Sequence, residues 1–234
     1  KGLFADHVDA IRDGIARNME EPGPYAAENL KDGDAGRFFD DYCNWTRIDE
    51  FEDVIRNSPA GAVAADLMES DSVQVFHDHV LVKEPGTSKP TPWHQDTPYL
   101  RVRGDQMIRV WLCCDHSPKE ITLQIVRGSH RWNVVFNGLP PDTDQKKLKN
   151  TGEGKMFAYV NEGGNIGPVT PDIEKYRDSF DILTWDVEPG DALIFNGNML
   201  HAAGGMDQSP GDRRAYASMW GGPDLLYIDP PENA

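Results

Sequence analysis

Cysteine is scarce in this sequence. The 234 residues contain three cysteines, Cys43 and the adjacent pair Cys113 and Cys114, which are too few for a disulfide framework. The adjacent pair is also unsuited to bridging within one strand, because neighbouring residues of a strand point to opposite faces. The sequence therefore predicts a reducing, intracellular setting, and we expect a cytoplasmic protein.

Positive charge and long apolar runs are scarce as well. Lysine and arginine number 23 against 39 aspartates and glutamates, which gives a formal net charge of −16. Nucleic acids and anionic membrane surfaces require a basic face, so this balance argues against both as partners. No apolar run approaches the roughly 18 residues of a membrane-spanning helix. The partner we expect is a small-molecule substrate.

Glycine and proline, by contrast, are plentiful. The chain has 22 Gly and 17 Pro, with 38% hydrophobic residues, which is typical of a loop-rich globular protein. Its length suits one domain, residues 1–234. Apolar residues recur every three or four positions in 3–19 and again in 48–69, where Ser58 and Pro59 interrupt them. We expect helices in both segments, within a helical N-terminal region at residues 1–70.

From residue 72 onward the pattern changes to short runs rich in Val, Ile, Leu, Trp and Phe, separated by clusters of turn-forming residues. Such runs predict strands. They occupy 73–83, 107–114, 121–126, 183–187, 191–196 and 213–220. The fold class is therefore mainly β with flanking helices, with a sandwich or barrel core over 72–227. Residues 137–181 show little periodicity, and we interpret them as an insertion able to cover a pocket.

The stretch "PTPWHQDTPYL", residues 90–100, holds the first candidate site. In a strand-like segment residues i and i+2 share a face, so His94 and Asp96 can point into one cavity. Two such ligands leave half of a metal's coordination sphere open, which suits iron in a 2-His-1-carboxylate triad if a second histidine arrives from elsewhere. Taken alone, a histidine and an aspartate at this spacing are more often surface or turn residues.

The best second histidine is His201. It follows "EPGDALIFNGNML", a turn and then an apolar run, so it is expected where a barrel strand ends. Shortly afterwards Arg213 and Arg214 open the run "RRAYASMW", and alternation sends one arginine inward and the other outward. An inward guanidinium needs an anion, and its fork matches a carboxylate. The alternative for such a pair is a solvated strand edge.

In combination these motifs resemble the phytanoyl-CoA dioxygenase family of iron- and 2-oxoglutarate-dependent oxygenases. The resemblance rests on "FHDHVLVKEPGTSKPTPWHQDTPY", "VWLCCD", "VRGSHRW", "WDVEPGDALIFNGNMLHAAGG" and "RRAYASMW". It implies a double-stranded β-helix, a cupin-like jelly-roll with helices on its outside. It also implies that His94, Asp96 and His201 bind Fe(II) as the catalytic triad. Arg213 then anchors the distal carboxylate of the cosubstrate 2-oxoglutarate, and dioxygen is the second cosubstrate.

The same resemblance implies further contacts around the cosubstrate. Trp111 and His79 match positions that line it, although a core aromatic and a structural histidine are the rival interpretations. Tyr99 is either pocket wall or a support for the metal ligands. Lys83, Tyr99 and Arg109 are candidate substrate residues.

The reaction and substrate class follow from these residues. Halogenating relatives carry a small residue at the carboxylate position, so Asp96 favours hydroxylation of a C–H bond, with release of succinate and carbon dioxide. Lys83, Arg101 and Arg103 fall near the metal-binding segment and suit an anionic substrate, unless the latter two pair with nearby acids. Two other functions stay open: a non-catalytic jelly-roll binding protein, and a cupin-type metal-dependent hydrolase or isomerase.

Overall fold

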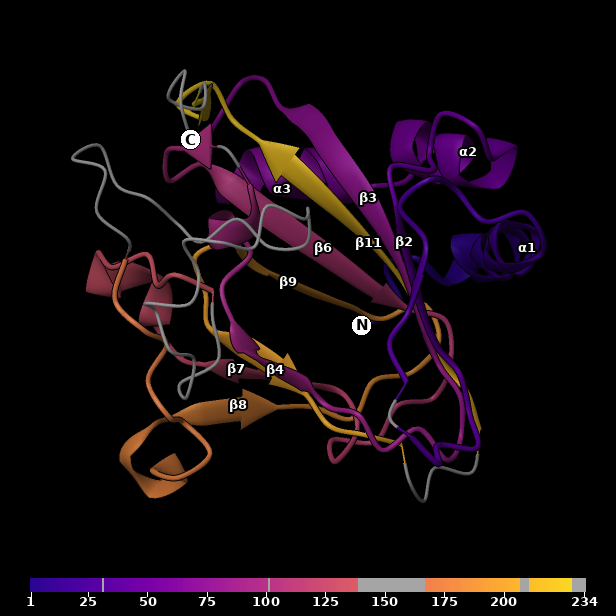
Figure 1. Ribbon diagram of the computed structural model, residues 1–234. Coiled ribbons are helices and arrows are strands. Elements are labelled where there is room, and N and C mark those ends of the chain that lie inside the picture. The colour runs from indigo at the N-terminus through magenta and orange to yellow at the C-terminus, as the bar shows by residue number, and fades with distance from the viewer. Residues whose placement is uncertain (31, 101, 139–166, 207–210, 229–234) are drawn as a thin grey trace.

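Two antiparallel sheets face each other and three helices pack on the outside of the larger one (Figure 1). The computed structural model describes residues 1–30, 32–100, 102–138, 167–206 and 211–228. The helices are α1 (Val8–Glu20), preceded by a 3-10 turn η1 (Ala5–His7), α2 (Asp49–Asn57) and α3 (Ala60–Leu67). This arrangement is the jelly-roll that the sequence predicts.

The larger sheet, which we call the main sheet, has six strands. Their order is β1 (Ala27–Glu28), β2 (Phe38–Tyr42), β3 (Gln74–Lys83), β11 (Arg213–Gly221), β6 (Met107–Cys113) and β9 (Ala192–Asn196). The opposite sheet has the order β4 (Thr91–His94), β10 (His201–Ala203), β7 (Leu123–Val126) and β8 (Ile182–Thr184). A separate pair joins β5 (Val102–Arg103) to β12 (Leu226–Tyr227).

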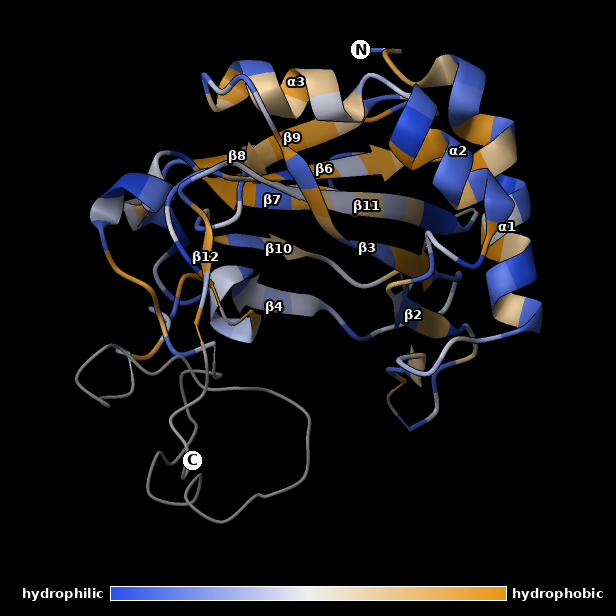
Figure 2. Cartoon of the chain, turned by 90° about the horizontal axis from the view of Figure 1, so that it is seen from above, coloured by the Kyte–Doolittle hydropathy of each residue, from blue (hydrophilic) through white to orange (hydrophobic). Residues whose placement is uncertain are grey.

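Alternation along the main sheet sorts its side chains between two cores. Val80 of β3 and Tyr216 of β11 face the helices, where the Tyr216 ring stacks on Phe51 of α2 with centroids 4.4 Å apart. Figure 2 shows hydrophobic stripes along α1 and α2. Apolar residues of these helices, such as Ile11 of α1, are buried in the same core as Val80 and Tyr216. The other face of each strand lines the interior between the sheets, together with the opposite sheet.

Most predicted elements are confirmed. The interruption at Ser58 and Pro59 separates α2 from α3, and the helix expected at 3–19 is the η1 turn followed by α1. Cys113 and Cys114 are both buried on opposite faces of the main sheet, one in the core between the sheets and the other under the helices. All three cysteines are free.

Several boundaries differ from the prediction. Strand β7 begins at Leu123 rather than at residue 121, and β8 ends at Thr184, so that Trp185 is exposed. The N-terminal region is not purely helical, because β1 and β2 within it extend the main sheet. Of the insertion predicted at 137–181, residues 139–166 lie outside the described residues. Ile173, in its described part, is buried in a small core with Leu200.

Candidate metal centre

The segment around His94 leaves its strand before it reaches Asp96. His94 is the last residue of β4, whereas Asp96 has helical backbone angles, φ −77° and ψ −35°, and precedes the 3-10 turn η2 (Thr97–Tyr99). The strand geometry expected for Asp96 is therefore wrong. A backbone hydrogen bond of 2.9 Å from the Asp96 N–H to the carbonyl of Gly197 sets its place instead. The two side chains still meet, because the turn brings the carboxylate back beside the imidazole.

Gln95, between the two, fixes this segment to its surroundings. Its side chain is 1% exposed and points away from the site. Nε2 donates to the carbonyls of Val134 (3.0 Å) and Asn198 (2.8 Å), and Oε1 accepts from the Phe136 N–H (2.9 Å). Three buried hydrogen bonds leave the segment little freedom. The middle residue thus orients its two neighbours.

His201 opens β10 and lies directly opposite His94 across the β10–β4 pair, with ring centroids 4.1 Å apart. The sequence predicted that His201 lies at the end of the preceding strand. In the structure it begins a short strand of its own. In each ring Nδ1 lies within hydrogen-bond distance of a backbone carbonyl, Pro92 at 2.7 Å for His94 and Met199 at 2.9 Å for His201. A carbonyl only accepts, so Nδ1 carries the proton and the Nε2 lone pair is free.

Both free nitrogens face one oxygen of Asp96. Nε2 of His94 and Nε2 of His201 each lie 3.7 Å from Oδ1. Two bonds of about 2.1 Å can join donors up to about 4.2 Å apart, so one ion can bridge these atoms. Within the described part of the chain, these three side chains form the one group of His, Cys, Asp or Glu residues whose ligand atoms all lie within 4.8 Å of one another.

The electrostatics of the site suit a cation. Burial alone would raise the pKa of Asp96, but the guanidinium of Arg109 holds it below its ordinary value, so the carboxylate is ionised. Burial lowers the pKa of His201 to about 3, which keeps its ring neutral. Asp96 Oδ2 is buried without a hydrogen-bond partner among the described residues. Two imidazole nitrogens and one carboxylate are the donor set that ferrous iron takes in a facial triad, and the residues fit that metal.

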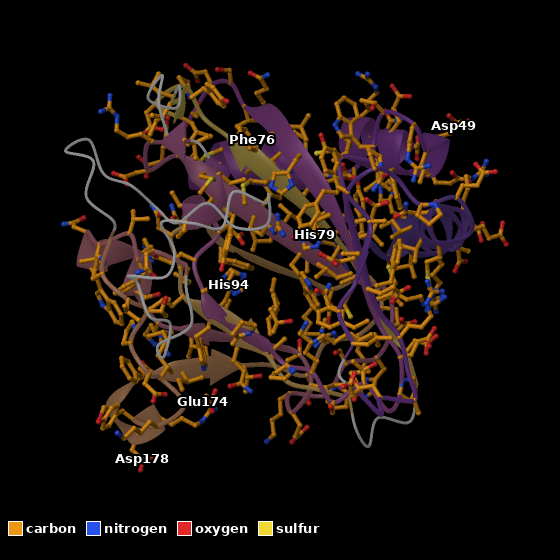
Figure 3. The ribbon with its side chains drawn as sticks, viewed as in Figure 1. Asp49, Phe76, His79, His94, Glu174 and Asp178 are labelled. Atoms are coloured by element: carbon orange, nitrogen blue, oxygen red, sulfur yellow. The ribbon has the colours of Figure 1, made fainter. Side chains whose placement is uncertain are left out.

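Arg109 connects this centre to the main sheet. It is 6% exposed, its Nε lies 3.6 Å from Asp96 Oδ2, and its Nη2 lies 3.0 Å from Nδ1 of His79. A guanidinium only donates, so Nδ1 of His79 accepts and Nε2 carries the proton, 3.4 Å from Asp40 Oδ2. The chain Asp40, His79, Arg109 and Asp96, of which Asp40 is half-buried and the other three are buried, therefore runs from β2 to the candidate metal centre. Figure 3 shows His79 and His94 on facing sides of the interior.

Asp40 and Tyr42 were missed by the sequence analysis. The Tyr42 ring stacks on His79 with centroids 3.8 Å apart. The signal was the alternation in "FFDDY", which puts Phe38, Asp40 and Tyr42 on one face of β2. Two adjacent aspartates disguise this strand, since acidic residues are depleted in strands.

The remaining predicted residues are distributed around the interior. Trp111 is 3% exposed on the inner face of β6, packed with Leu123 and Ile125 of β7. Tyr99 meets His94 edge-on at 5.8 Å between centroids, and its hydroxyl donates to the Gly138 carbonyl. Residue 101 lies outside the described residues, and Arg103 is exposed on β5. The cationic side chain that the described residues bring within ion-pair distance of the candidate metal ligands is that of Arg109.

Alternation predicts that Arg213 and Arg214 point to opposite faces, and the structure has Arg213 inward and Arg214 outward. Arg213 is 3% exposed and donates to the Ile121 carbonyl, whereas Arg214 forms a two-bond ion pair with Asp115, at 3.0 and 2.6 Å. Lys83, expected among the substrate residues, is fully buried and lies opposite Arg213 across the β3–β11 pair.

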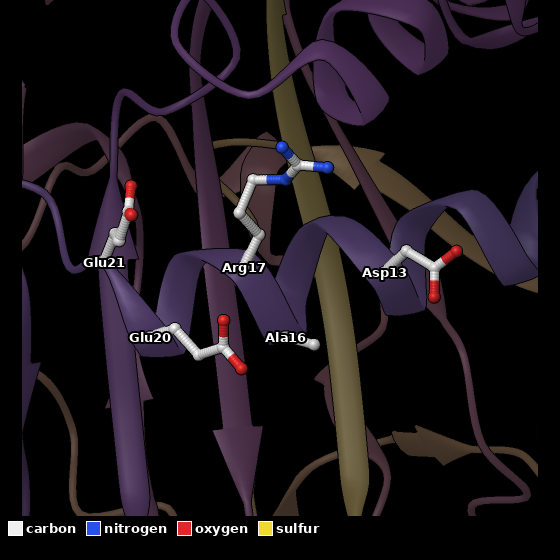
Figure 4. A pocket seen from close by; sticks show the side chains of 5 residues that line it. All are labelled: Asp13, Ala16, Arg17, Glu20 and Glu21. Carbon is white, nitrogen blue, oxygen red and sulfur yellow. The ribbon is translucent and has the colours of Figure 1, made fainter.

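A shallow surface pocket lies elsewhere, on the exposed side of α1. Its lining is made of Asp13, Ala16, Arg17, Glu20 and Glu21 (Figure 4). Arg17 pairs with Glu50 of α2 at 2.6 Å. This pocket belongs to the helical layer, on the other side of the main sheet from the triad, and its charged groups are those of a solvated helix face.

The fold and the triad together define the class of non-haem iron oxygenases that use 2-oxoglutarate. The family model of phytanoyl-CoA dioxygenase (PhyH) matches residues 1–215, and the chain belongs to this family. The dioxygenase lolE1 of Epichloe uncinata is 26% identical over 207 residues, 80% of this chain and 67% of that protein. The protein is accordingly a 2-oxoglutarate-dependent non-haem iron oxygenase whose cofactors are iron, 2-oxoglutarate and dioxygen.

Solved structures share the fold. The epimerase SnoN from nogalamycin biosynthesis, in complex with Fe3+, alpha ketoglutarate and nogalamycin RO, is 18% identical with a TM-score of 0.67, over 100% of this chain and 84% of that one. EvdO2 from Micromonospora carbonacea var. aurantiaca, complexed with 2-oxoglutarate, is 18% identical with a TM-score of 0.61, over 97% and 85%. None of the helices in the described residues is long and apolar enough to cross a membrane.

Proposed function

We propose that this oxygenase hydroxylates a C–H bond of a small-molecule substrate, with Fe(II) held by His94, Asp96 and His201 and 2-oxoglutarate anchored by Arg213. One observation carries the proposal. The free Nε2 atoms of both histidines face the same oxygen of an ionised, buried carboxylate at 3.7 Å. Iron and 2-oxoglutarate, once bound, supply the oxidative chemistry: dioxygen is reduced, 2-oxoglutarate loses carbon dioxide to become succinate, and a substrate C–H bond is oxidised.

In this reaction the protein orients the metal ligands and keeps water out of the interior. Backbone carbonyls of Pro92 and Met199 keep the Nδ1 protons in place, which fixes the direction of both Nε2 lone pairs. Arg109 engages Oδ2 of Asp96 and leaves Oδ1 to the metal side. Trp111 and the apolar side chains of β7 exclude water from the interior, as oxidation of a C–H bond requires.

Arg213 is suited to the distal carboxylate by its isolation. Its guanidinium is buried, and burial lowers its pKa to about 10. Among the described residues it donates to the carbonyl of Ile121 and pairs with no carboxylate. A buried cation that lacks a protein anion favours an anionic ligand. This arginine also argues against the cupin-type hydrolase or isomerase, which has no use for it, and the complete triad argues against a non-catalytic binding protein.

The proposal of an anionic substrate rests on one atom of Arg109. Arg109 Nη1 is buried without a hydrogen-bond partner among the described residues, so an anionic group of the substrate beside the metal would satisfy it.

The cytoplasm stays the expected location, supported by the three free cysteines.

The test is an incubation of the iron-loaded protein with 2-oxoglutarate, isotopically labelled dioxygen and a panel of small metabolites. We expect one metabolite to stimulate succinate release and to gain one labelled oxygen atom. A substrate that is epimerised, cyclised or desaturated without the label would overturn hydroxylation and leave the oxygenase class intact. If neither coupled nor uncoupled turnover depends on iron, the enzyme assignment itself is contradicted.

A further inference from the structure

Two basic side chains, those of Lys83 and Arg213, lie side by side at one end of the main sheet's inner face. Strand pairing aligns Phe38 of β2, Lys83 of β3 and Arg213 of β11 in one row. Directly paired residues of antiparallel strands have neighbouring side chains on the same face. Lys83 is 0% exposed and Arg213 is 3% exposed. Burying two like charges together is costly unless an anion compensates them.

The surroundings of Lys83 supply carbonyls and a ring. Nζ donates to the carbonyls of Lys89 (2.9 Å) and Gly204 (3.2 Å), and it lies 4.2 Å from the centroid of the Phe38 ring. An ammonium has three donors, so these two bonds leave one N–H over. None of the carboxylates in the described ranges is within ion-pair distance of Lys83 or Arg213.

The charges that act on Lys83 have one sign, because both belong to cations, Arg213 and Lys89. The group that acts on Arg213 is the Cys113 thiol, which raises the pKa of the arginine against the effect of burial. Burial, with these two cations, lowers the pKa of Lys83 to about 6. Near neutral pH the amine is therefore mostly uncharged until an anion arrives.

We propose that Lys83 is a second cosubstrate-binding residue, which together with Arg213 clamps the distal carboxylate of 2-oxoglutarate. This inference rests on the proposed function, because it assigns a partner to Arg213 at the same subsite. Entry of the carboxylate stabilises the ammonium, so the amine takes a proton from solvent as the cosubstrate binds. Binding of 2-oxoglutarate is consequently coupled to proton uptake at Lys83 Nζ.

A merely structural lysine is the alternative. Its two hydrogen bonds to Lys89 and Gly204 would tie two loops together, and its loss would then lower stability without changing the thermodynamics of cosubstrate binding. Proton uptake separates the two roles, because a loop tie has no reason to change its protonation with the ligand.

The experiment is anaerobic calorimetry of the Fe(II)-loaded protein near neutral pH, in two buffers of different ionisation enthalpy. The ligands are 2-oxoglutarate and 2-oxopentanoate, which has the same chain length and a methyl group in place of the distal carboxylate. Lys83→Met, Lys83→Arg and, as a matched control, Lys119→Met are compared with the wild type. Lys119 has an exposed side chain on a loop.

The wild type is expected to take up a large fraction of a proton with 2-oxoglutarate and almost none with 2-oxopentanoate. Lys83→Met should lose the uptake and bind 2-oxoglutarate roughly tenfold to a hundredfold more weakly, with little change for 2-oxopentanoate. Lys83→Arg should keep tight binding but lose the uptake, because arginine is already charged. Lys119→Met should behave as the wild type.

Wild-type affinity and wild-type proton uptake in Lys83→Met overturn the inference and leave the proposed function standing. Should Lys83→Met fail to fold, Lys83→Arg decides: uptake that persists in it places the proton elsewhere and overturns the inference. Absence of 2-oxoglutarate binding to the iron-loaded wild type contradicts the proposed function itself, which distinguishes the two failures.

Discussion

Arg109 lies beside Asp96 with its Nε 3.6 Å from Oδ2, on the side of the carboxylate opposite the two histidines. The two oxygens of the Asp96 carboxylate therefore have different neighbours, because Oδ1 faces the imidazoles and Oδ2 faces a buried guanidinium. Arg109 also contacts His79 of β3 through its Nη2. Residues that support metal ligands in this way tune affinity without touching the metal.

Replacement of Arg109 by methionine should weaken metal binding by roughly tenfold to a hundredfold, because Asp96 loses its support and its charge partner. Anaerobic equilibrium dialysis with Co(II) measures this, and Arg109→Lys should recover part of the affinity. Arg127→Met is a suitable control, since Arg127 pairs with Asp181 at the surface. Unchanged affinity in Arg109→Met would show that Asp96 needs no such support.

Replacement of His201 by alanine should reduce metal affinity further than loss of Arg109 does, because a ligand atom itself disappears. Circular dichroism should show a folded chain, since the backbone pairing of His201 with β4 and β7 does not depend on its ring. The matched variant is His116→Ala, which removes an exposed histidine paired with Glu188. Equal metal binding by the two variants would be incompatible with the triad.

The adjacent arginines allow a test of the cosubstrate anchor. Arg213→Ala should raise the KM for 2-oxoglutarate by roughly tenfold to a hundredfold, since a buried charge-assisted contact is lost. Arg214→Ala removes the ion pair with Asp115 and should lower the free energy of unfolding by about 1 kcal/mol while leaving that KM unchanged. The measurement is succinate release against 2-oxoglutarate concentration. The reverse pattern would move the anchor to the other face of β11.

The metal-free protein should show a pH dependence that originates at Lys83. Its pKa falls from 10.5 in the unfolded chain to about 6 in the folded one. Between these values the unfolded state binds the extra proton, so the contribution to stability increases as pH rises, by up to about 1.4 kcal/mol per pH unit. The relevant quantity is the difference in unfolding free energy between wild type and Lys83→Met, which removes the contribution of other groups.

Chemical denaturation at several pH values above neutrality measures this difference. It should grow with pH in the metal-free protein. With iron and 2-oxoglutarate bound it should flatten, because the bound carboxylate restores the pKa of Lys83. Parallel curves for the two proteins without cosubstrate would show that the lysine is charged in the folded state.

Local pattern predicted much of this molecule from the sequence. Alternation along 213–220 predicts that one of the two arginines points inward and the other outward, and the structure has Arg213 inside and Arg214 outside. The break at Pro59 is equally local, since proline cannot continue a helix past its first turn. What these features share is that neighbouring residues determine them.

Features set by partners distant in the sequence were not predicted. The strand β2 exists because it pairs with β3, and its acidic sequence gives little sign of this. Asp96 reaches the metal centre through a turn held by Gly197 and by the hydrogen bonds of Gln95 rather than through strand alternation. The sequence predicted that the side chains of His94 and Asp96 meet, and they do, although the backbone geometry is a turn rather than the strand that was expected.

The central claim is that His94, Asp96 and His201 hold the iron. Anaerobic crystals of the Fe(II)-loaded protein, with diffraction data recorded on both sides of the iron absorption edge, test it most directly. An anomalous peak bounded by Nε2 of His94, Nε2 of His201 and the carboxylate of Asp96 is the predicted result. A peak bound by other residues, with these three side chains free of metal, would contradict it.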